Sequence, residues 1–361
     1  MSTAFLVLED GTLIKAKHTG AKKDVFGELV FNTSMTGYEE AFTDPSYAGQ
    51  ILLMTYPLVG NYGIRKKNFE SNKVQIRGLI LKEPCFFAYR GMHLDKFLDL
   101  SKVSCLYNID TRALTLKIRK HGTMKAMIVA HPSKMDYHTL LRRIKQTPYP
   151  DAENLVAQVS CTKKTIHGKG PSRFVLIDCG VKSSILKHLI KHGTVIQIPF
   201  DTDIKTIDRL KPDGIVVSNG PGNPAHQAIL STTARTVEKL IDKYPIMGIC
   251  LGHQILGLVL GFKTYKLKFG HRGSNHAVKH VCSQKIYITS QNHGYALQTQ
   301  NNLDAEITWV NVNDGTIEGI RHRTRPVFSV QFHPEAAPGP RDTWFLFREF
   351  AELTICQNAK T

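Results

Sequence analysis

From residue 173 onward, short apolar runs alternate with amphipathic helical segments, and this alternation limits the fold more than any other feature. The runs at 174–178, 195–198 and 214–218 have the length and composition of buried strands. Between the first two, Val181, Ile185 and Leu189 recur at helical spacing. Alternating strands and helices are typical of a parallel sheet covered by helices. The sequence therefore predicts an α/β domain with a largely parallel central sheet over 173–361.

The first 150 residues follow a different pattern, rich in strands. An Asp10-Gly11 turn between apolar segments predicts a β-hairpin, and further strand and helix segments follow it. Residues 151–172 carry lysines, glycines and a proline, a composition typical of a connector. A chain of 361 residues also exceeds what one core usually organises. We expect a strand-rich mixed α/β domain at 1–150, a linker at 151–172 and the second domain at 173–361.

The amino-acid composition indicates the cellular compartment in which the protein works. The chain is 42% hydrophobic and 21% charged, which is typical of a soluble globular protein. No apolar run approaches the roughly 20 residues of a membrane helix, and Glu9 and Asp10 come too early for a secretory signal. Seven scattered cysteines without a C-x-x-C pair argue against a disulfide framework or a zinc site. We expect a cytoplasmic protein without a membrane partner.

The formal net charge of +17 indicates a strongly basic surface. The lysines and arginines are spread along the chain, and no nucleic-acid-reading motif accompanies them. We therefore expect no nucleic-acid partner. A well-solvated basic surface, or one that faces an acidic protein, accounts for the charge.

The sharpest local motif is Gly248-x-Cys250-x-Gly252, where an apolar strand runs directly into a helix. A tight strand-to-helix turn exposes its central side chain at the sheet edge, and only small flanking residues fit there. The helix N-terminus then stabilises a thiolate, and the N–H of Leu251 is available to an oxyanion. These features predict a nucleophilic cysteine; the alternative is a structural cysteine between two packing glycines.

Two further motifs follow predicted strands of the same domain. His333 and Glu335 come after the strand at 327–330, so that the carboxylate can orient an imidazole towards a thiol. Gly220 and Gly222 lie in the loop that follows another strand, and they offer bare backbone N–H groups. That loop lacks the lysine of a phosphate-binding loop. A solvated loop histidine and a plain turn are the alternatives for each motif alone.

Together these blocks (SNGPG at 218–222, GICLGHQ at 248–254 and HPE at 333–335) resemble the signatures of class I, triad-type glutamine amidotransferases. The rest of the chain is similar to carbamoyl-phosphate synthase small subunits. The segments that carry this second resemblance are FNTSMTGY at 31–38, TDPSY at 43–47, NIDTR at 108–112, NLVAQVS at 154–160, SQNHGY at 290–295 and PEAAPGP at 334–340. Asn223 and Ala277 depart from the family pattern, which usually has aspartate and proline there, and neither touches the triad.

The resemblance implies the chemistry of the site. Cys250 corresponds to the nucleophile, His333 to the base and Glu335 to its orienting carboxylate. The residues at the family's glutamine contacts are Ser46, Gly220, Gly222, Leu251, Gln254, Asn292, Gly294 and Tyr295. His271, His276 and His280 lie in a segment similar to a structural loop of the family, so we expect no metal and no cofactor in this chain.

The resemblance also implies a partner. A large synthetase subunit would receive the ammonia and use ATP and Mg to make carbamoyl phosphate from bicarbonate. Two alternative hypotheses keep the triad but differ in the enzyme that it serves. The chain could be a glutaminase subunit of another ammonia-using synthase, or a free-standing γ-glutamyl hydrolase. The N-terminal domain counts against both. A basic binding protein without catalysis is a further alternative, and the intact cysteine, histidine and glutamate count against it.

Overall fold

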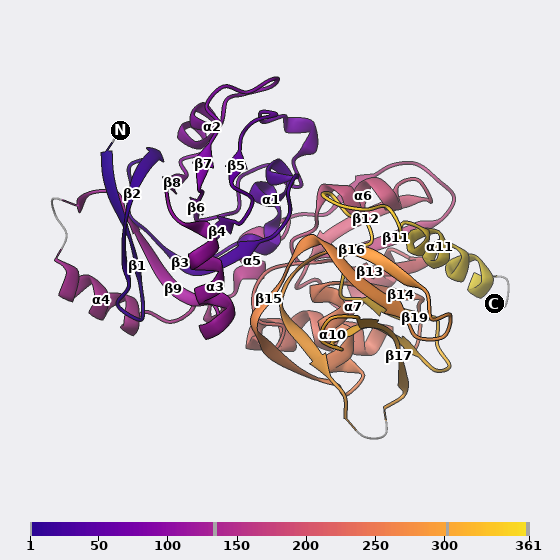
Figure 1. Ribbon diagram of the computed structural model, residues 1–361. Coiled ribbons are helices and arrows are strands. Elements are labelled where there is room, and N and C mark those ends of the chain that lie inside the picture. The colour runs from indigo at the N-terminus through magenta and orange to yellow at the C-terminus, as the bar shows by residue number, and fades with distance from the viewer. Residues whose placement is uncertain (1, 133–135, 301–302, 359–361) are drawn as a thin grey trace. The chain divides into compact units, whose positions relative to one another are not determined.

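The computed structural model describes residues 2–132, 136–300 and 303–358. The chain forms two compact units, Met1–Glu153 and Asn154–Thr361. In Figure 1 the first unit runs from indigo to magenta and the second from magenta to yellow. Each unit has its own buried apolar clusters.

The N-terminal unit is built on a closed barrel of seven strands in the order β1-β2-β8-β6-β4-β3-β9. The hairpin predicted at Asp10-Gly11 is confirmed: β1 and β2 pair antiparallel, and the Gly11 N–H donates to the Leu8 carbonyl over 3.0 Å. The barrel strands are β1 (Ser2–Leu8), β2 (Leu13–Gly20), β3 (Val25–Asn32), β4 (Gln50–Met54), β6 (Gly78–Ile80), β8 (Ser104–Tyr107) and β9 (Met124–Val129).

Helices and a small ribbon surround this barrel. Apolar residues of α1 and α2, among them Phe42, Leu94 and Leu98, are buried against strand residues of β4 and β6. A separate two-stranded ribbon, β5-β7, lies outside the barrel order. The elements are α1 (Tyr38–Thr43), η1 (Pro45–Tyr47), β5 (Leu58–Val59), η2 (Lys66–Asn68), β7 (Glu83–Pro84), α2 (Leu94–Leu100), α3 (Thr111–His121), α4 (Tyr137–Gln146) and η4 (Pro150–Ala152).

The C-terminal unit contains one ten-stranded sheet, β10-β12-β11-β13-β14-β19-β18-β16-β15-β17. Its centre, β12-β11-β13-β14-β19, is parallel, as the sequence predicts, and the strands on both sides of this centre are antiparallel. The strands are β10 (Thr165–His167), β11 (Arg173–Asp178), β12 (Thr194–Pro199), β13 (Gly214–Val217), β14 (Ile246–Ile249), β15 (Lys263–His280), β16 (Ile286–Gln298), β17 (Ala305–Asn311), β18 (Ile317–His322) and β19 (Val327–Val330).

The central strands are buried on both faces, which explains their continuous apolar composition. The segment expected as a connector at 151–172 contains α5 and also β10, which pairs with β12 in this sheet. No helix in the described ranges is long and apolar enough to cross a bilayer. The helices are α5 (Leu155–Val159), α6 (Ser183–Leu189), α7 (Ile204–Arg209), α8 (Gln227–Ile229), a π-turn (Leu230–Ala234), α9 (Arg235–Leu240), α10 (Leu251–Val259) and α11 (Phe345–Asn358).

Helix α10 approaches the sheet too closely for side chains at two positions. A Cβ atom on Gly252 would lie 2.1 Å from the carbonyl oxygen of Val217 in β13, and one on Gly248 would lie 2.6 Å from the oxygen of Gly252. Real Cβ atoms do not approach backbone oxygens so closely. Glycine at both positions therefore sets how tightly the β14–α10 turn can close.

We expect Gly252→Ala to lower the free energy of unfolding by roughly 1–3 kcal/mol, because backbone must shift to admit the methyl group. Urea unfolding measures this loss. Gly294→Ala is a matched control, since its added Cβ would meet only the flexible end of Arg272, at 3.3 Å. Equal stability of the two variants would contradict the close-packing argument.

Candidate active site

Cys250 occupies the turn between β14 and α10. Its backbone has φ 53° and ψ −101°, a positive φ that is uncommon for a residue other than glycine. Its N–H donates to the Val330 carbonyl over 2.9 Å, which ties the turn to the end of β19. Cys250 is 2% exposed, and its Sγ lies 3.7 Å from the Asn292 carbonyl oxygen. This is the strained strand-to-helix turn that presents a nucleophile at a sheet edge.

His333 and Glu335 follow the end of β19, the neighbour of β14 in the sheet. His333 is held by its backbone, whose N–H donates to the Ser290 carbonyl over 2.9 Å. Its Nδ1 lies 2.6 Å from Glu335 Oε1, while Nε2 has no hydrogen-bond partner among the described residues. The carboxylate thus holds the proton on Nδ1 and leaves Nε2 available for proton transfer.

Lys182 is a residue that the sequence analysis missed. It follows the end of β11, its side chain is only 3% exposed, and its Nζ donates to Glu335 Oε1 over 2.9 Å. A second hydrogen bond, of 2.7 Å, reaches the Ala336 carbonyl. The one available signal was its position, a lysine in the loop between a parallel strand and the next helix. Glu335 is therefore shared by one imidazole and one ammonium group.

These contacts shift the pKa values of Glu335 and His333 in opposite directions. Burial raises the pKa of Glu335, but Lys182 and His333 outweigh it and hold that pKa well below its ordinary value. Burial lowers the pKa of His333, yet the Glu335 carboxylate and the nearby Cys250 thiol raise it above its ordinary value, despite Lys182. Glu335 is thus kept as a carboxylate, and His333 is kept able to carry a proton.

The loop after β13 lies beside the turn. The Gly252 N–H donates to the Ser218 carbonyl over 3.1 Å, which joins this loop to α10. A Cβ on Gly220 would lie 2.1 Å from the Cys179 oxygen, so only glycine fits there. Gly222 has φ 91° and packs near Leu155. Glycine therefore keeps the backbone of this loop bare next to the Cys250 turn.

The remaining predicted contacts lie around α10 and β16. Leu251 is the first residue of α10, where backbone N–H groups lack helical partners. The Gln254 side chain donates to the Tyr295 carbonyl over 2.8 Å and to Gln331 Oε1 over 3.0 Å, so it fastens α10 to β16. Asn292 and Gly294 belong to the same stretch of β16, and Asn292 supplies the carbonyl oxygen near the thiol. The structure thus places Leu251 and Asn292 next to Cys250 and joins Gln254 to Tyr295.

Ser46 belongs to the other unit. It lies in η1, is 6% exposed, and its N–H donates to Asp44 Oδ1 over 2.9 Å. This contact holds the TDPSY segment in a tight turn within the N-terminal unit. Its assignment as a glutamine contact stays a prediction.

A second cluster of ionisable residues lies on β15, β16 and β18, antiparallel strands of the C-terminal sheet. His271, His293 and Glu318 are buried, and one donor atom from each lies within 4.8 Å of the others, so the set has the ligand types of a metal site. Protein groups contact the other polar atoms of these side chains, but His271 Nδ1 and Glu318 Oε2 are buried without a hydrogen-bond partner among the described residues. His271 pairs with Asp314 at 2.9 Å, and the ring nitrogens of His293 lie 2.8 and 3.0 Å from the Tyr295 carbonyl and the Gln291 side chain. The expectation of no metal stays a prediction.

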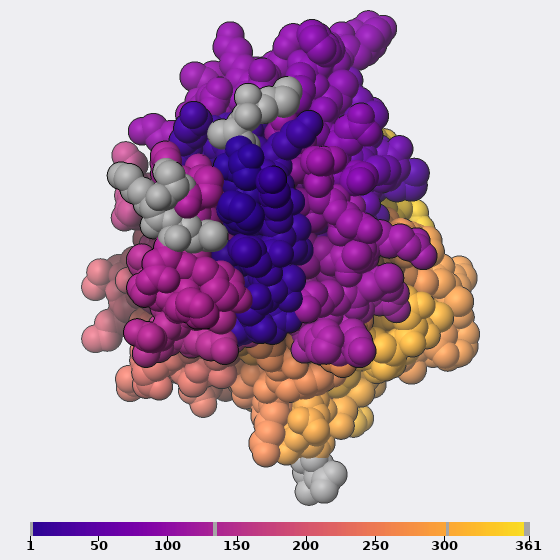
Figure 2. Space-filling model, turned by 60° about the vertical axis from the view of Figure 1, so that its left-hand side comes forward, coloured from indigo at the N-terminus to yellow at the C-terminus, as the bar shows by residue number. Residues whose placement is uncertain are grey.

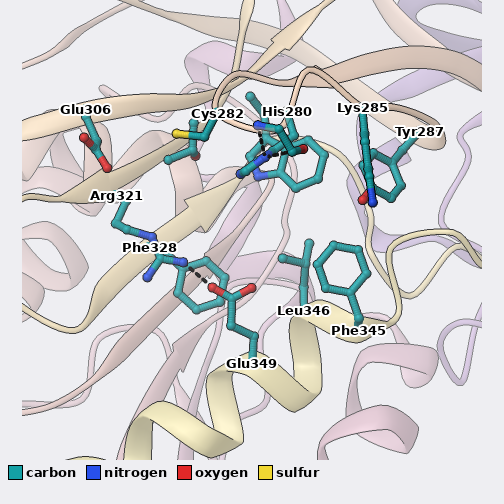
Figure 3. Close-up of a pocket in the computed structure, with 13 residues that line it drawn as sticks. His280, Cys282, Lys285, Tyr287, Glu306, Arg321, Phe328, Phe345, Leu346 and Glu349 are labelled. Atoms are coloured by element: carbon teal, nitrogen blue, oxygen red, sulfur yellow. Dashed lines mark hydrogen bonds and ion pairs between the residues drawn. The ribbon is translucent and has the colours of Figure 1, made fainter.

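A surface pocket of about 430 Å³ lies elsewhere in the C-terminal unit, and none of the predicted site residues lines it (Figure 3). Arg321 and Glu349 form an ion pair in it. The Trp309 ring, one of its walls, packs edge-on against Phe332 with centroids 5.4 Å apart. Since Phe332 precedes His333, the pocket lies behind the histidine segment and is separate from the Cys250 site.

His253, on α10, provides a test of how the helix is buried. Burial lowers its pKa to about 3, and Nδ1 lies 2.9 Å from Ser329 Oγ. A depressed folded-state pKa contributes stability above the unfolded pKa near 6.5, and this contribution is lost as pH falls towards 3. Between pH 7 and pH 5 we expect wild type to lose roughly 2 kcal/mol more than His253→Asn.

Urea unfolding of both proteins at the two pH values measures that difference. Asparagine is the appropriate replacement because it retains a polar atom for Ser329 but does not titrate. Parallel pH dependence in the two proteins would show that His253 protonates in the folded state without cost.

The chain matches two family models, one for each unit. Residues 6–128 match the model described as the carbamoyl-phosphate synthase small chain, CPSase domain. Residues 175–353 match glutamine amidotransferase class-I. The predicted family resemblances and the α/β fold class are therefore confirmed.

Named relatives cover nearly the whole chain. A carbamoyl phosphate synthase small chain from Methanocaldococcus jannaschii is 48% identical over 97% of this chain and 98% of its own. One from Methanopyrus kandleri is 46% identical over 98% and 99%. A carbamoyl phosphate synthase pyrimidine-specific small chain from Halalkalibacterium halodurans is 46% identical over 96% of both chains. This chain belongs to the family of carbamoyl phosphate synthase small chains.

Proposed function

We propose that this chain is the glutamine-hydrolysing subunit of a two-chain carbamoyl-phosphate synthase. The observation that carries the proposal is the arrangement of Cys250, His333 and Glu335 at adjacent strand ends, with the carboxylate fixed 2.6 Å from the imidazole. A nucleophile in a strained turn beside an oriented base is the requirement for acyl transfer through a covalent intermediate. The small-chain relatives support glutamine as the amide that is attacked.

In the proposed reaction, the Cys250 thiolate attacks the side-chain amide carbon of glutamine. The backbone N–H groups of Leu251 and Gly220 stabilise the oxyanion, and His333 gives its proton to the departing nitrogen, so that ammonia leaves. Water then attacks the γ-glutamyl thioester, with His333 as base, which releases glutamate and regenerates the thiol. Glu335 keeps the imidazole oriented throughout.

Glutamine contacts are proposed for the residues that surround this turn, together with Ser46 of the N-terminal unit. They are Ser46, Gly220, Gly222, Leu251, Gln254, Asn292, Gly294 and Tyr295. The bare backbone at Gly220 and Gly222 supports the loop's role, since it offers N–H groups close to the thiol. We propose no resident metal or cofactor for glutamine hydrolysis in this chain.

The proposed partner is the large synthetase subunit, which would take the ammonia and join it to bicarbonate with ATP and Mg. The relatives' designation as small chains supports a second subunit. We propose a cytoplasmic location, because all seven cysteines are unpaired in the structure, which suits a reducing compartment. Neither nucleic acid nor membrane has a place in the proposed reaction.

Cys250→Ser is expected to abolish glutamine-dependent carbamoyl phosphate synthesis, because serine is a far weaker nucleophile without a matched base. Synthesis from free ammonia should continue at the wild-type rate, since that reaction bypasses this chain. Both rates are measured in the complex with the large subunit, under saturating ATP and bicarbonate. Loss of the ammonia-dependent rate as well would contradict the proposal that this chain only hydrolyses glutamine and the large subunit uses the ammonia.

Lys182→Met is expected to reduce glutamine hydrolysis by about 10- to 100-fold, because Glu335 loses one of its two cationic partners and orients His333 less firmly. It also breaks a buried ion pair, which costs roughly 3 kcal/mol of unfolding free energy. Lys187→Met, an exposed lysine on the following helix, is the matched control. Wild-type kinetics in a folded Lys182→Met protein would exclude a positioning role.

A further inference from the structure

Three side chains of types that bind metal ions meet between strands of the C-terminal sheet. His271 comes from β15, His293 from β16 and Glu318 from β18. One ligand atom of each lies within 4.8 Å of the other two. The orange surface in Figure 2 belongs to β15, β16 and neighbouring segments, but these three residues lie beneath the surface, at 8%, 5% and 0% exposure. Polar groups this deep in a protein need partners for their polar atoms.

His271 is held in the orientation that metal-binding histidines adopt. Its Nε2–H donates to Asp314 Oδ2 over 2.9 Å. Its Nδ1 atom is buried, has no hydrogen-bond partner among the described residues and lies 3.7 Å from Glu318 Oε1. A histidine that binds a metal usually donates its other N–H to a carboxylate or carbonyl, which fixes the tautomer and makes the binding nitrogen more basic. The contact with Asp314 therefore leaves the Nδ1 lone pair available to a cation beside Glu318.

A buried ion pair is the alternative for His271 and Glu318. Burial lowers the pKa of His271, but the carboxylates of Glu318 and Asp314 outweigh it and raise that pKa. The 3.7 Å between Nδ1 and Oε1 nevertheless exceeds the length of a charge-assisted hydrogen bond, about 2.7–2.9 Å. Glu318 Oε2 also has no hydrogen-bond partner in the described part of the chain. One divalent cation between the two side chains would satisfy both of these buried atoms.

His293 has one nitrogen more than its protein partners can use. Nδ1 lies 2.8 Å from the Tyr295 carbonyl oxygen, and Nε2 lies 3.0 Å from Gln291 Oε1. Burial, together with the charge of His271, holds the pKa of His293 well below its ordinary value, so the imidazole is neutral. A neutral imidazole has one N–H and can donate to only one of these two oxygens. With the proton on Nδ1, the Nε2 lone pair suits a metal ion better than the oxygen of Gln291.

Glu318 is fixed through both its backbone and its side chain. Its carbonyl oxygen accepts from the Gln331 N–H over 2.8 Å, and its Oε1 accepts from Asn311 Nδ2 over 2.9 Å. Asn311 is neutral, and a buried carboxylate is stable only when a positive charge compensates it. The fixed carboxylate therefore presents Oε2 as a site for a cation.

We propose that His271, His293 and Glu318 bind one zinc ion. Two imidazoles and a carboxylate are an established ligand set for zinc, with water in the fourth position, whereas calcium and magnesium prefer oxygen ligands alone. Ligand atoms around a tetrahedral zinc are roughly 3.4 Å apart, so the three side chains close by about 1 Å on binding. The expectation of no metal rests on His271, His276 and His280 of a single segment, and it does not extend to this set from three strands.

The zinc ion would link strands that have few other connections near the cluster. The pairing of β15 with β16 shifts register on both sides of residues 271–273, and β16 pairs with β18 at Leu297 and Ile317. His293 lies between Asn292 and Gly294, two of the proposed glutamine contacts on β16. The ion thus supports this strand from behind, and it takes no part in the proposed hydrolysis itself.

The test titrates zinc chloride into the full chain after chelator treatment and dialysis. Calorimetry should give one ion per chain with a dissociation constant of about 0.1 μM or lower. Zinc at 100 times that concentration should raise the unfolding temperature by roughly 5–10 °C. Cys250→Ser is titrated in parallel, because the active-site thiolate is a second zinc ligand of this chain, and it should bind zinc as wild type does.

Glu318→Gln is the decisive variant, because the amide keeps the shape of the side chain and an oxygen for Asn311. It should raise the zinc dissociation constant by about 100-fold, and Asp314→Asn should raise it by about 10-fold through the orientation of His271. His280→Asn is the matched control and should bind zinc as wild type does. This histidine lies at the end of β15, contacts Ser283 and is outside the proposed set.

Three results would overturn the site. The first is a wild-type chain that takes up no zinc. The second is binding lost in Cys250→Ser, or a thiolate charge-transfer band in the cobalt-substituted protein, since either assigns the ion to cysteine. The third is wild-type affinity in a Glu318→Gln protein whose fold is verified by urea unfolding. If Glu318→Gln does not fold, wild-type affinity in Asp314→Asn has the same meaning, because Asp314 is partly exposed in a turn.

Discussion

The buried charge of Glu335 is the constraint on which the arrangement of the site depends. Its side chain is fully buried, and an unpaired carboxylate there would cost several kcal/mol. Lys182 and His333 both contact its Oε1 atom. Lys182 follows β11 and Glu335 follows β19, and β13 and β14 lie between these strands in the sheet. The ion pair thus joins two loops across the strand ends that carry the glycine loop and Cys250.

This arrangement links stability to chemistry. The ammonium group keeps Glu335 ionised inside the protein, and the ionised carboxylate in turn keeps His333 basic. A histidine–glutamate pair alone would leave the buried carboxylate dependent on the protonation of the same imidazole that transfers the proton. With Lys182 present, the carboxylate retains a positive partner while His333 is neutral. Lys182 therefore allows His333 to lose and regain its proton without leaving the buried Glu335 carboxylate unpaired.

The sequence predicts those features of the fold that are set by residues close together in the chain. The parallel strands are continuous apolar runs, and the Cys250 turn is marked by Gly248 and Gly252, whose side chains would strike backbone. Lys182 carried no such mark, because its partner lies far along the chain and only folding brings the two together. The long strand β15 was also missed. It contains glycines, lysines and histidines in no alternating order, and its pairing with β16 shifts register twice. Tertiary pairing forms this strand against its local preference.

The closed barrel restricts how the N-terminal unit can recognise another protein. A barrel pairs every strand on both sides, so it offers no free sheet edge to a partner. A closed barrel therefore excludes recognition by strand addition to its own sheet. The β5-β7 ribbon and the Ile64–Met92 bridge fix a loop outside the strand order without opening the barrel. The loop on that base exposes Phe87 and Tyr89 while the strands beneath it stay fully paired.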